Sequence, residues 1–217
     1  MPKIPRYQRF SSYQNCYEYH YQEMDRDITK TDTSYSKIIL ELWCGSGAYV
    51  RELAKQHPEN LYIGVDSKSD RLCFGADYCK EHHIDNTKWL RSQVDHLSHC
   101  FSKASIDEIR ITFPDPRPTR NRQKLTSLKF QTIYKSIIKP DGILHVKTDD
   151  KDFFEYSKQI LVEGWMIIWE CYENIYAIDG LIEKKPELWI ITYYESIRLE
   201  QWRTVYYLNS SYVTTSK

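Results

Sequence analysis

The segment ELWCGSG at 41–47 combines a carboxylate with two glycines at the end of an apolar run. Because glycine has no Cβ, Gly45 and Gly47 let the backbone take positive φ and come close to a ligand. Glu41 lies inside the apolar run, where an unpaired carboxylate is costly to bury. A cationic ligand beside this loop would give Glu41 a partner. The segment therefore predicts a small-molecule site that favours positive charge.

A second carboxylate, Asp66, ends the run LYIGVD about twenty residues after the glycines, the spacing at which an acid accepts hydrogen bonds from ribose hydroxyls. A dinucleotide fingerprint would need a third glycine three residues after Gly47, but Val50 stands there. The alternative is that Asp66 only caps the next helix. Taken with Glu41 and the two glycines, Asp66 favours a ligand that contains one nucleoside.

The loop FPDPRPTRNRQK at 113–124 is the second candidate for chemistry. Three prolines around Asp115 fix backbone φ and remove donors, so the loop is stiff. It follows a predicted strand, and ligands of open α/β sheets bind at the carboxyl ends of strands. Cations at the start of a helix oppose its dipole, so Arg120, Arg122 and Lys124 suit an external polyanion better than the helix. A rigid surface turn is the alternative.

Alternating strands and helices must position these loops. Strands are predicted at 37–43, 61–66, 87–94, 105–113 and 142–148, and helices at 48–57, 67–83, 125–138 and 152–164. This alternation implies an α/β fold with a parallel sheet and helices on both faces. Two further strands, at 165–173 and 186–195, break the alternation and are predicted to be antiparallel.

The chain has 217 residues and a formal net charge of zero. Its length suits a single domain, predicted at 37–217 behind a Tyr-rich N-terminal arm at 1–36. Because there is neither an apolar run of membrane-spanning length nor a secretory signal, no membrane association is predicted and the expected location is cytoplasmic. Zero net charge does not exclude a nucleic-acid partner, since the basic residues from Arg117 to Lys129 cluster and a local patch can hold phosphates.

These motifs resemble the bacterial tRNA (guanine-N7-)-methyltransferases over residues 38–195. The most specific match is FPDP at 113–116 with the basic run after it. Further matches are LYIGVD, KPDGILHVKTDD at 139–150 and TYYE at 192–195. The resemblance implies a Rossmann-like class I methyltransferase with a seven-stranded, mostly parallel sheet and an antiparallel C-terminal strand. It also implies methyl transfer from S-adenosylmethionine to N7 of the variable-loop guanine of tRNA.

The resemblance also implies roles for individual residues. The cofactor would be bound by Glu41, Gly45, Gly47, Asp66, Gln93 and Asp115. Asp115 would in addition be the catalytic carboxylate between cofactor and guanine. The substrate would be bound by Thr119, Arg120, Asp149, Thr192 and Glu195. We expect a monomer or homodimer that needs no metal and no obligatory protein partner.

The chain departs from the family pattern at both loops. Trp43 stands where the family has glycine, and Arg117 stands where it has tryptophan after FPDP. Thr119 and Arg120 are nearest to the place of a family lysine. Gln93 replaces an aspartate that reads the adenine amine, and a glutamine carbonyl accepts the same hydrogen bond.

The chemistry agrees with this set of residues. Guanine N7 carries a lone pair and no hydrogen, so its methylation needs orientation and no general base. Carboxylates stabilise the cation that forms and accept from the N1 and N2 donors of guanine. Two alternatives stay open: an S-adenosylmethionine-dependent methyltransferase of another substrate, and a non-catalytic RNA-binding protein with this fold. A further hypothesis is that the arm, with Arg6 and Arg9, closes over tRNA.

Overall fold

The computed structural model describes residues 5–19, 27–30, 32 and 34–213, without the side chains of Arg6 and Tyr7. Its strands are β1 Cys16–Glu18, β2 Ile38–Leu42, β3 Leu61–Asp66, β4 Thr87–Arg91, β5 Ile106–Thr112, β6 Ile138–Thr148, β7 Met166–Tyr172 and β8 Tyr206–Tyr212. Its helices are α1 Arg6–Phe10, α2 Ala48–Gln56, α3 Ser69–Glu81, α4 Leu97–Cys100, α5 Leu128–Ile137, α6 Lys151–Glu163, α7 Leu181–Lys184 and α8 Tyr193–Glu200. Short 3-10 helices are η1 Val94–His96, η2 Asn121–Gln123, η3 Ile175–Ala177 and η4 Pro186–Trp189. Within this described part, no helix is long and apolar enough to cross a membrane.

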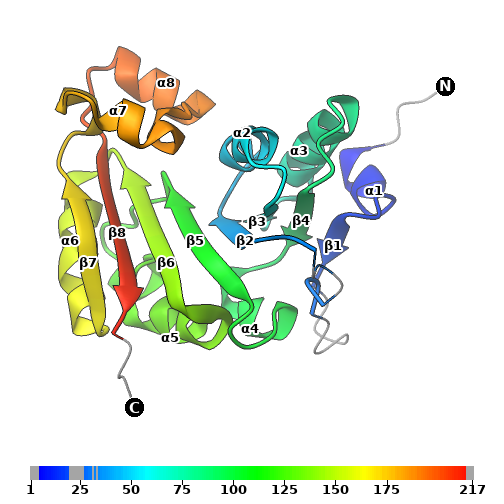
Figure 1. The fold of residues 1–217 in the computed structure, drawn as a ribbon, viewed down its shortest axis with the longest axis horizontal. Helices are drawn as coiled ribbons and strands as arrows, with labels where there is room; N and C mark the ends of the chain where they lie inside the picture. Colours follow the sequence, from blue (N-terminus) through cyan, green and yellow to red (C-terminus); the bar gives the residue numbers. More distant parts are fainter. Residues whose placement is uncertain (1–4, 20–26, 31, 33, 214–217) are drawn as a thin grey trace.

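All eight strands form one sheet, in the order β1-β4-β3-β2-β5-β6-β8-β7 (Figure 1). Neighbours from β1 to β6 in this order are parallel, and β8 is antiparallel to both β6 and β7. The predicted mostly parallel sheet with an antiparallel C-terminal strand is therefore confirmed. The prediction counted seven strands, and the eighth is β1, which the N-terminal arm adds beside β4.

Two apolar clusters cover the two faces of the sheet, because successive side chains of a strand point to opposite sides. In β2, Leu40 and Leu42 pack with side chains of α4, α5 and α6, whereas Ile39 packs with those of α1, α2 and α3. In Figure 1, α5 and α6 lie behind β6, β7 and β8. These layers hold the carboxyl ends of the parallel strands at one edge, where ligand sites of such sheets form.

The predicted strand at 186–195 is wrong, because this segment forms η4 and the start of α8. Leu188 and Ile190 are buried and alternate with exposed residues, which imitates the pattern of a strand. The segment packs on α2, where the Tyr49 hydroxyl donates a hydrogen bond to the carbonyl of Glu187 at 2.6 Å. The place beside β6 belongs to β8 instead. In Figure 1, α7 and α8 lie above the ends of β6 and β7.

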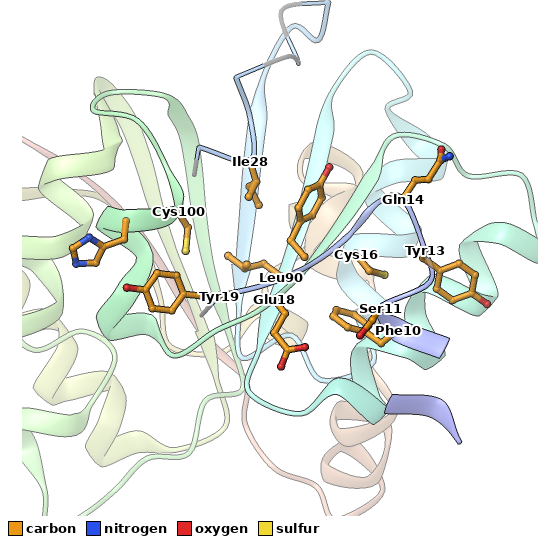
Figure 2. Close-up of a pocket in the computed structure, with 12 residues that line it drawn as sticks. Phe10, Ser11, Tyr13, Gln14, Cys16, Glu18, Tyr19, Ile28, Leu90 and Cys100 are labelled. Atoms are coloured by element: carbon orange, nitrogen blue, oxygen red, sulfur yellow. The ribbon is translucent and has the colours of Figure 1, made fainter. Parts of the chain in front are cut away.

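Part of the N-terminal arm is docked on the edge of the sheet. Asp77 of α3 accepts hydrogen bonds from Arg9 Nη2 at 2.6 Å and from the Tyr13 hydroxyl at 2.5 Å. Tyr19 stacks on His96 of η1, with ring centroids 4.7 Å apart. Figure 2 shows the pocket of about 340 Å³ that this arm lines together with Leu90 of β4. Residues 1–4, 20–26, 31 and 33 of the predicted arm, and the Arg6 side chain, lie outside the described residues. Closure of the arm over tRNA stays a prediction.

Candidate functional site

Glu41 is buried beneath the loop that joins β2 to α2. The residue is 5% exposed, and its Oε2 accepts a hydrogen bond from the backbone N–H of Val50 at 3.3 Å. Burial raises the pKa of Glu41 to about 7, although a hydrogen bond from Thr112 and the charge of Arg110 act in the opposite direction. A buried carboxyl that protonates this easily fits a site that a bound cation completes.

Asp66, at the end of β3, holds the turn after β2. Its Oδ2 accepts a hydrogen bond from the backbone N–H of Gly45 at 3.1 Å, and its Oδ1 accepts one from that of Lys68 at 2.8 Å. No side-chain cap is present on α3, whose N-cap residue is Lys68, so Asp66 is not its helix cap. The structure thus brings Glu41, Gly45, Gly47 and Asp66 together at one loop.

Gly47 is needed for packing as well as for its backbone angle. It is the N-cap of α2 with φ at +64°, and a Cβ there would lie 2.4 Å from the ring of Trp89. This buried indole also lies under Gly64 and Gly75, where a Cβ would approach it to 3.0 Å and 2.4 Å. The Trp89 ring therefore packs directly against the backbone of the loop, and the missing side chains of Gly47, Gly64 and Gly75 leave the space that this ring occupies.

Substitution of the two loop glycines by alanine is expected to cost different amounts of stability. Gly47→Ala is expected to lower the free energy of unfolding by roughly 2–5 kcal/mol, because it combines overpacking with a strained φ. Gly45 has a similar φ of +59° but nothing within 4 Å of its Cβ position. Gly45→Ala is therefore expected to cost only about 1–2 kcal/mol. Urea unfolding of both variants measures the difference, and equal losses would contradict the role given to Trp89.

A first pocket, of about 390 Å³, is lined by Trp43 just before the glycines, by the segment after β4 and by the loop after β5, whereas Glu41, Gly45, Gly47 and Asp66 are not among its lining residues. Its wall includes Trp43, Gln93 and Arg117. The guanidinium of Arg117 lies over the indole of Trp43, with Cζ 4.9 Å from the ring centroid, and its Nη1 donates to Gln123. The two positions identified from the sequence as departures from the family pattern thus contact each other, and Gln93 lines the same pocket.

A second pocket, of about 620 Å³, borders the FPDP loop, the turn between β6 and α6, and the segment from α8 to β8. Asp149 lines it and pairs with Arg198, whose Nε lies 3.2 Å from Oδ2. The guanidinium of Arg198 lies 4.6 Å from the centroid of the Tyr194 ring, and that ring lies 5.6 Å from the ring of Phe113. Asp149 is therefore held on the polar wall of a pocket that reaches the FPDP loop.

Asp115 lies beside both pockets and lines neither; the next two residues, Pro116 and Arg117, line the second and the first pocket respectively. Its side chain is 62% exposed. Its Oδ1 accepts a hydrogen bond from the backbone N–H of Arg117 at 3.1 Å, and its Oδ2 lies 3.6 Å from Arg117 Nε. Phe113 and Arg117 have φ of +46° and +43°, so left-handed backbone on both sides of Asp115 sets the direction of its side chain.

The basic run after FPDP is only partly available to a polyanion. Thr119, Arg120 and Arg122 are exposed in the turn and in η2. Lys124 is 5% exposed, and its Nζ lies over the ring of Tyr156, 4.2 Å from the centroid. The expectation that Lys124 meets an external polyanion is therefore wrong, because its aliphatic stem is packed and its charge rests on an aromatic face.

Thr192 and Glu195 form the capping box that begins α8. The Glu195 carboxylate has no exposed surface and pairs with the buried Lys147, whose Nζ lies 2.7 Å from Oε1. The hydroxyl of Tyr176 donates to the same oxygen at 2.6 Å. Direct contact of Glu195 with a substrate stays a prediction, and it would require α8 to move.

Several residues of the site carried no signal in the sequence. Tyr194 lies on a helix where a strand was predicted, and Arg198 lies on the same helix beyond that predicted strand, so the approach of Arg198 to Asp149 was missed. The contact between Trp43 and Arg117 joins segments more than 70 residues apart. The three glycines that surround Trp89 were the one available clue to its position.

Comparisons with known proteins agree with this geometry. A family model described as a putative methyltransferase matches residues 35–195. A tRNA (guanine-N(7)-)-methyltransferase of Christiangramia forsetii is 31% identical, with 95% of this chain and 96% of that protein covered. One from Porphyromonas gingivalis is 33% identical over 79% of this chain and 70% of that protein.

Among solved structures, the fold is similar to a 30S ribosomal A1408 methyltransferase from an uncultured bacterium. The TM-score is 0.62 at 19% identity, covering 83% of this chain and 89% of that one, a likeness that concerns the fold alone. Fold, site and family model together define a methyltransferase of the α/β class. Within that class, the chain belongs to the tRNA (guanine-N7-)-methyltransferase family.

Proposed function

We propose that this protein transfers a methyl group from S-adenosylmethionine to N7 of a guanine in tRNA, the variable-loop guanine. The observation that carries the proposal is the exposed Asp115 carboxylate, whose next two residues line two pockets, one of which includes Trp43 before the glycines and the other Asp149. The choice of substrate rests on the similarity of this chain to tRNA (guanine-N(7)-)-methyltransferases. The loop geometry supplies a reason for the division into a cofactor side and a base side.

The residues of the first side fit the proposed cofactor. Glu41 is a buried carboxyl that forms no ion pair with the described residues, and the carboxylate of Asp66, also buried, lies at the end of β3. Glu41 would bind the positively charged part, Asp66 the ribose and Gln93 the adenine amine. When bound, S-adenosylmethionine supplies an electrophilic methyl group. Backbone N–H groups fix the direction of both carboxylates: that of Val50 donates to Glu41, and that of Gly45 donates to Asp66.

On the side of the second pocket, the chain's residues would orient the guanine base and stabilise the positive charge that forms on it. Because N7 has no proton to lose, Asp115 need not act as a base. Its negative charge stabilises the cationic base that methylation creates, and Asp149 accepts from a donor on the edge of guanine. Thr119 and Arg120, exposed beside the FPDP loop, are placed to contact the RNA backbone. The rigid loop supplies the alignment on which the rate depends.

Incubation of the protein with S-adenosylmethionine and unmodified tRNA tests the proposal. Mass spectrometry of the digested tRNA is expected to show 7-methylguanosine. A methylated product on another substrate, with none on tRNA, would establish the first alternative function. Failure to bind S-adenosylmethionine by calorimetry, with retained RNA binding, would establish the non-catalytic alternative.

The pKa of Glu41 predicts that cofactor affinity depends on pH. The free protein holds Glu41 protonated below about pH 7, and a cationic cofactor requires the ionised form. The dissociation constant of S-adenosylmethionine is therefore expected to rise about tenfold from pH 8 to pH 6. Calorimetry across this range measures it.

Glu41→Gln is the control for this pH dependence. The amide has nearly the same shape as the carboxyl and does not titrate. The affinity of Glu41→Gln for S-adenosylmethionine is therefore expected to be weaker than that of the wild type at pH 8 and to change little between pH 8 and pH 6. A wild-type affinity that does not change between these pH values would exclude Glu41 as the partner of the cation.

A further inference from the structure

Trp202 projects from the rim of the second pocket. It is 95% exposed, and its φ is +56° at the turn that leaves α8. Its backbone N–H donates to the carbonyl of Leu199 at 2.9 Å, which holds the turn in place. Tryptophan presents a large flat apolar surface and concentrates at binding interfaces. A rigid turn that presents an indole to solvent beside the FPDP loop is suited to hold a ligand.

The charges around Trp202 are those of a nucleic-acid contact. Arg203, which follows it, is exposed and lines the same pocket, as does Lys151. Two of the three aspartates that line the pocket have internal partners: Asp149 pairs with Arg198, and Asp150 caps α6 by accepting from the N–H of Phe153 at 2.6 Å. The third, Asp152, is exposed in the first turn of α6, where its charge suits the helix dipole. An aromatic face beside cations binds an unstacked base together with its phosphate.

We infer that Trp202 stacks on an unpaired RNA nucleotide that flanks the methylated guanine, and that Arg203 contacts the phosphate of that nucleotide. This inference rests on the proposed function. An indole that is 95% exposed cannot wall an enclosed base pocket, so its partner lies at the rim. Pro116, Asp149 and Tyr194, which are less exposed than Trp202, also line the pocket. Trp202 therefore acts on RNA affinity and leaves the cofactor side unchanged.

Trp165 provides a matched control. It is 75% exposed, has φ of +65°, and also occupies a turn between a helix and a strand, after α6 and before β7. That turn lies at the opposite end of the sheet, because β7 and β8 are antiparallel and Trp202 precedes β8 (Figure 1). A general effect of removing an exposed indole would appear in both variants.

The experiment measures tRNA binding by filter retention and methylation kinetics for the wild type, Trp202→Ala, Trp202→Phe and Trp165→Ala. Trp202→Ala is expected to raise the Kd and KM for tRNA about 5- to 100-fold, with kcat at saturating tRNA and the Kd for S-adenosylmethionine within about twofold. Trp202→Phe is expected to recover most of the affinity, and Trp165→Ala to behave as the wild type. Arg203→Ala is expected to reduce the slope of log Kd against log salt by about 0.7–1, whereas Trp202→Ala leaves that slope unchanged.

Unchanged tRNA affinity in Trp202→Ala, or equal losses in Trp202→Ala and Trp165→Ala, would overturn the inference. Loss of self-association in Trp202→Ala without loss of tRNA affinity, seen by sedimentation, would assign the surface to a second copy of the chain and also overturn it. The binding assay needs no turnover. A wild type that binds tRNA through Trp202 but does not methylate it would therefore refute the proposed function alone.

Discussion

Asp115→Ala is expected to lower kcat for tRNA methylation about 100- to 1000-fold, the range found when one group that stabilises transition-state charge is removed. The Asp115 side chain is 62% exposed and lies beside the two pockets rather than in their walls, so it packs against little. The free energy of unfolding is therefore expected to stay within about 0.5 kcal/mol of the wild type. Single-turnover methylation assays and urea unfolding measure the two quantities.

Two variants sharpen this experiment. Asp115→Asn keeps an acceptor for the Arg117 N–H but removes the charge, so it separates loop geometry from electrostatic stabilisation. Asp141→Ala removes an exposed carboxylate near the start of β6, at the opposite edge of the sheet, and is expected to leave kcat unchanged. Near-normal activity in Asp115→Ala would refute the catalytic role of Asp115.

Glu195→Ala is expected to lower the free energy of unfolding by about 3–5 kcal/mol, since it leaves a buried lysine without its counter-ion. The Glu195 and Lys147 side chains are 0% and 4% exposed, and Lys147 Nζ lies 2.7 Å from Glu195 Oε1. Burial already lowers the pKa of Lys147, so the pair, together with the carbonyl of Leu188 at 2.8 Å, keeps that charge in place. The substitution also breaks the capping box of α8.

Glu200→Ala is the matched control, because it removes the same charge from an exposed position on α8. Its effect on stability is expected to lie within about 0.5 kcal/mol. Replacing both members of the buried pair, Lys147→Met with Glu195→Leu, is expected to recover much of the lost stability. A Glu195→Ala variant that is as stable as Glu200→Ala, but loses tRNA affinity, would instead show that Glu195 contacts the substrate directly.

The order of strands and helices between 37 and 164 could be predicted because each element carries its own periodicity. LYIGVD became β3 over the same residues, and the helices before and after it lie within their predicted ranges. The C-terminal region was predicted less well. Leu188 and Ile190 alternate with exposed neighbours as a strand would, yet Ile190 packs with side chains of α2, and Leu188 packs in a small cluster that Leu199 of α8 adjoins. The Thr-x-x-Glu spacing at Thr192 and Glu195, which marks the start of a helix, was the signal that could have corrected this.

β8 was missed for a related reason. Its sequence YYLNSSY is rich in polar side chains, so it does not show the apolar pattern of an interior strand. It lies between β6 and β7 all the same. There Asn209 and Ser210 are buried beside neighbouring strands, and Asn209 donates to Glu170. Only the neighbours make this strand stable, and they come from distant parts of the chain.

The sequence by itself determined the loops that carry the chemistry. Two glycines after a buried glutamate, an aspartate at the end of the next strand and FPDP after β5 are local patterns, and strand ends of a parallel sheet meet at one edge whatever the details. Tertiary structure decided which side chains face each other across that edge. It buried Glu195 against Lys147, placed Arg117 on Trp43, joined Arg198 to Asp149 and left Trp202 in solvent. These contacts depend on the packing of segments far apart in the chain, so the local periodicity of the sequence does not predict them.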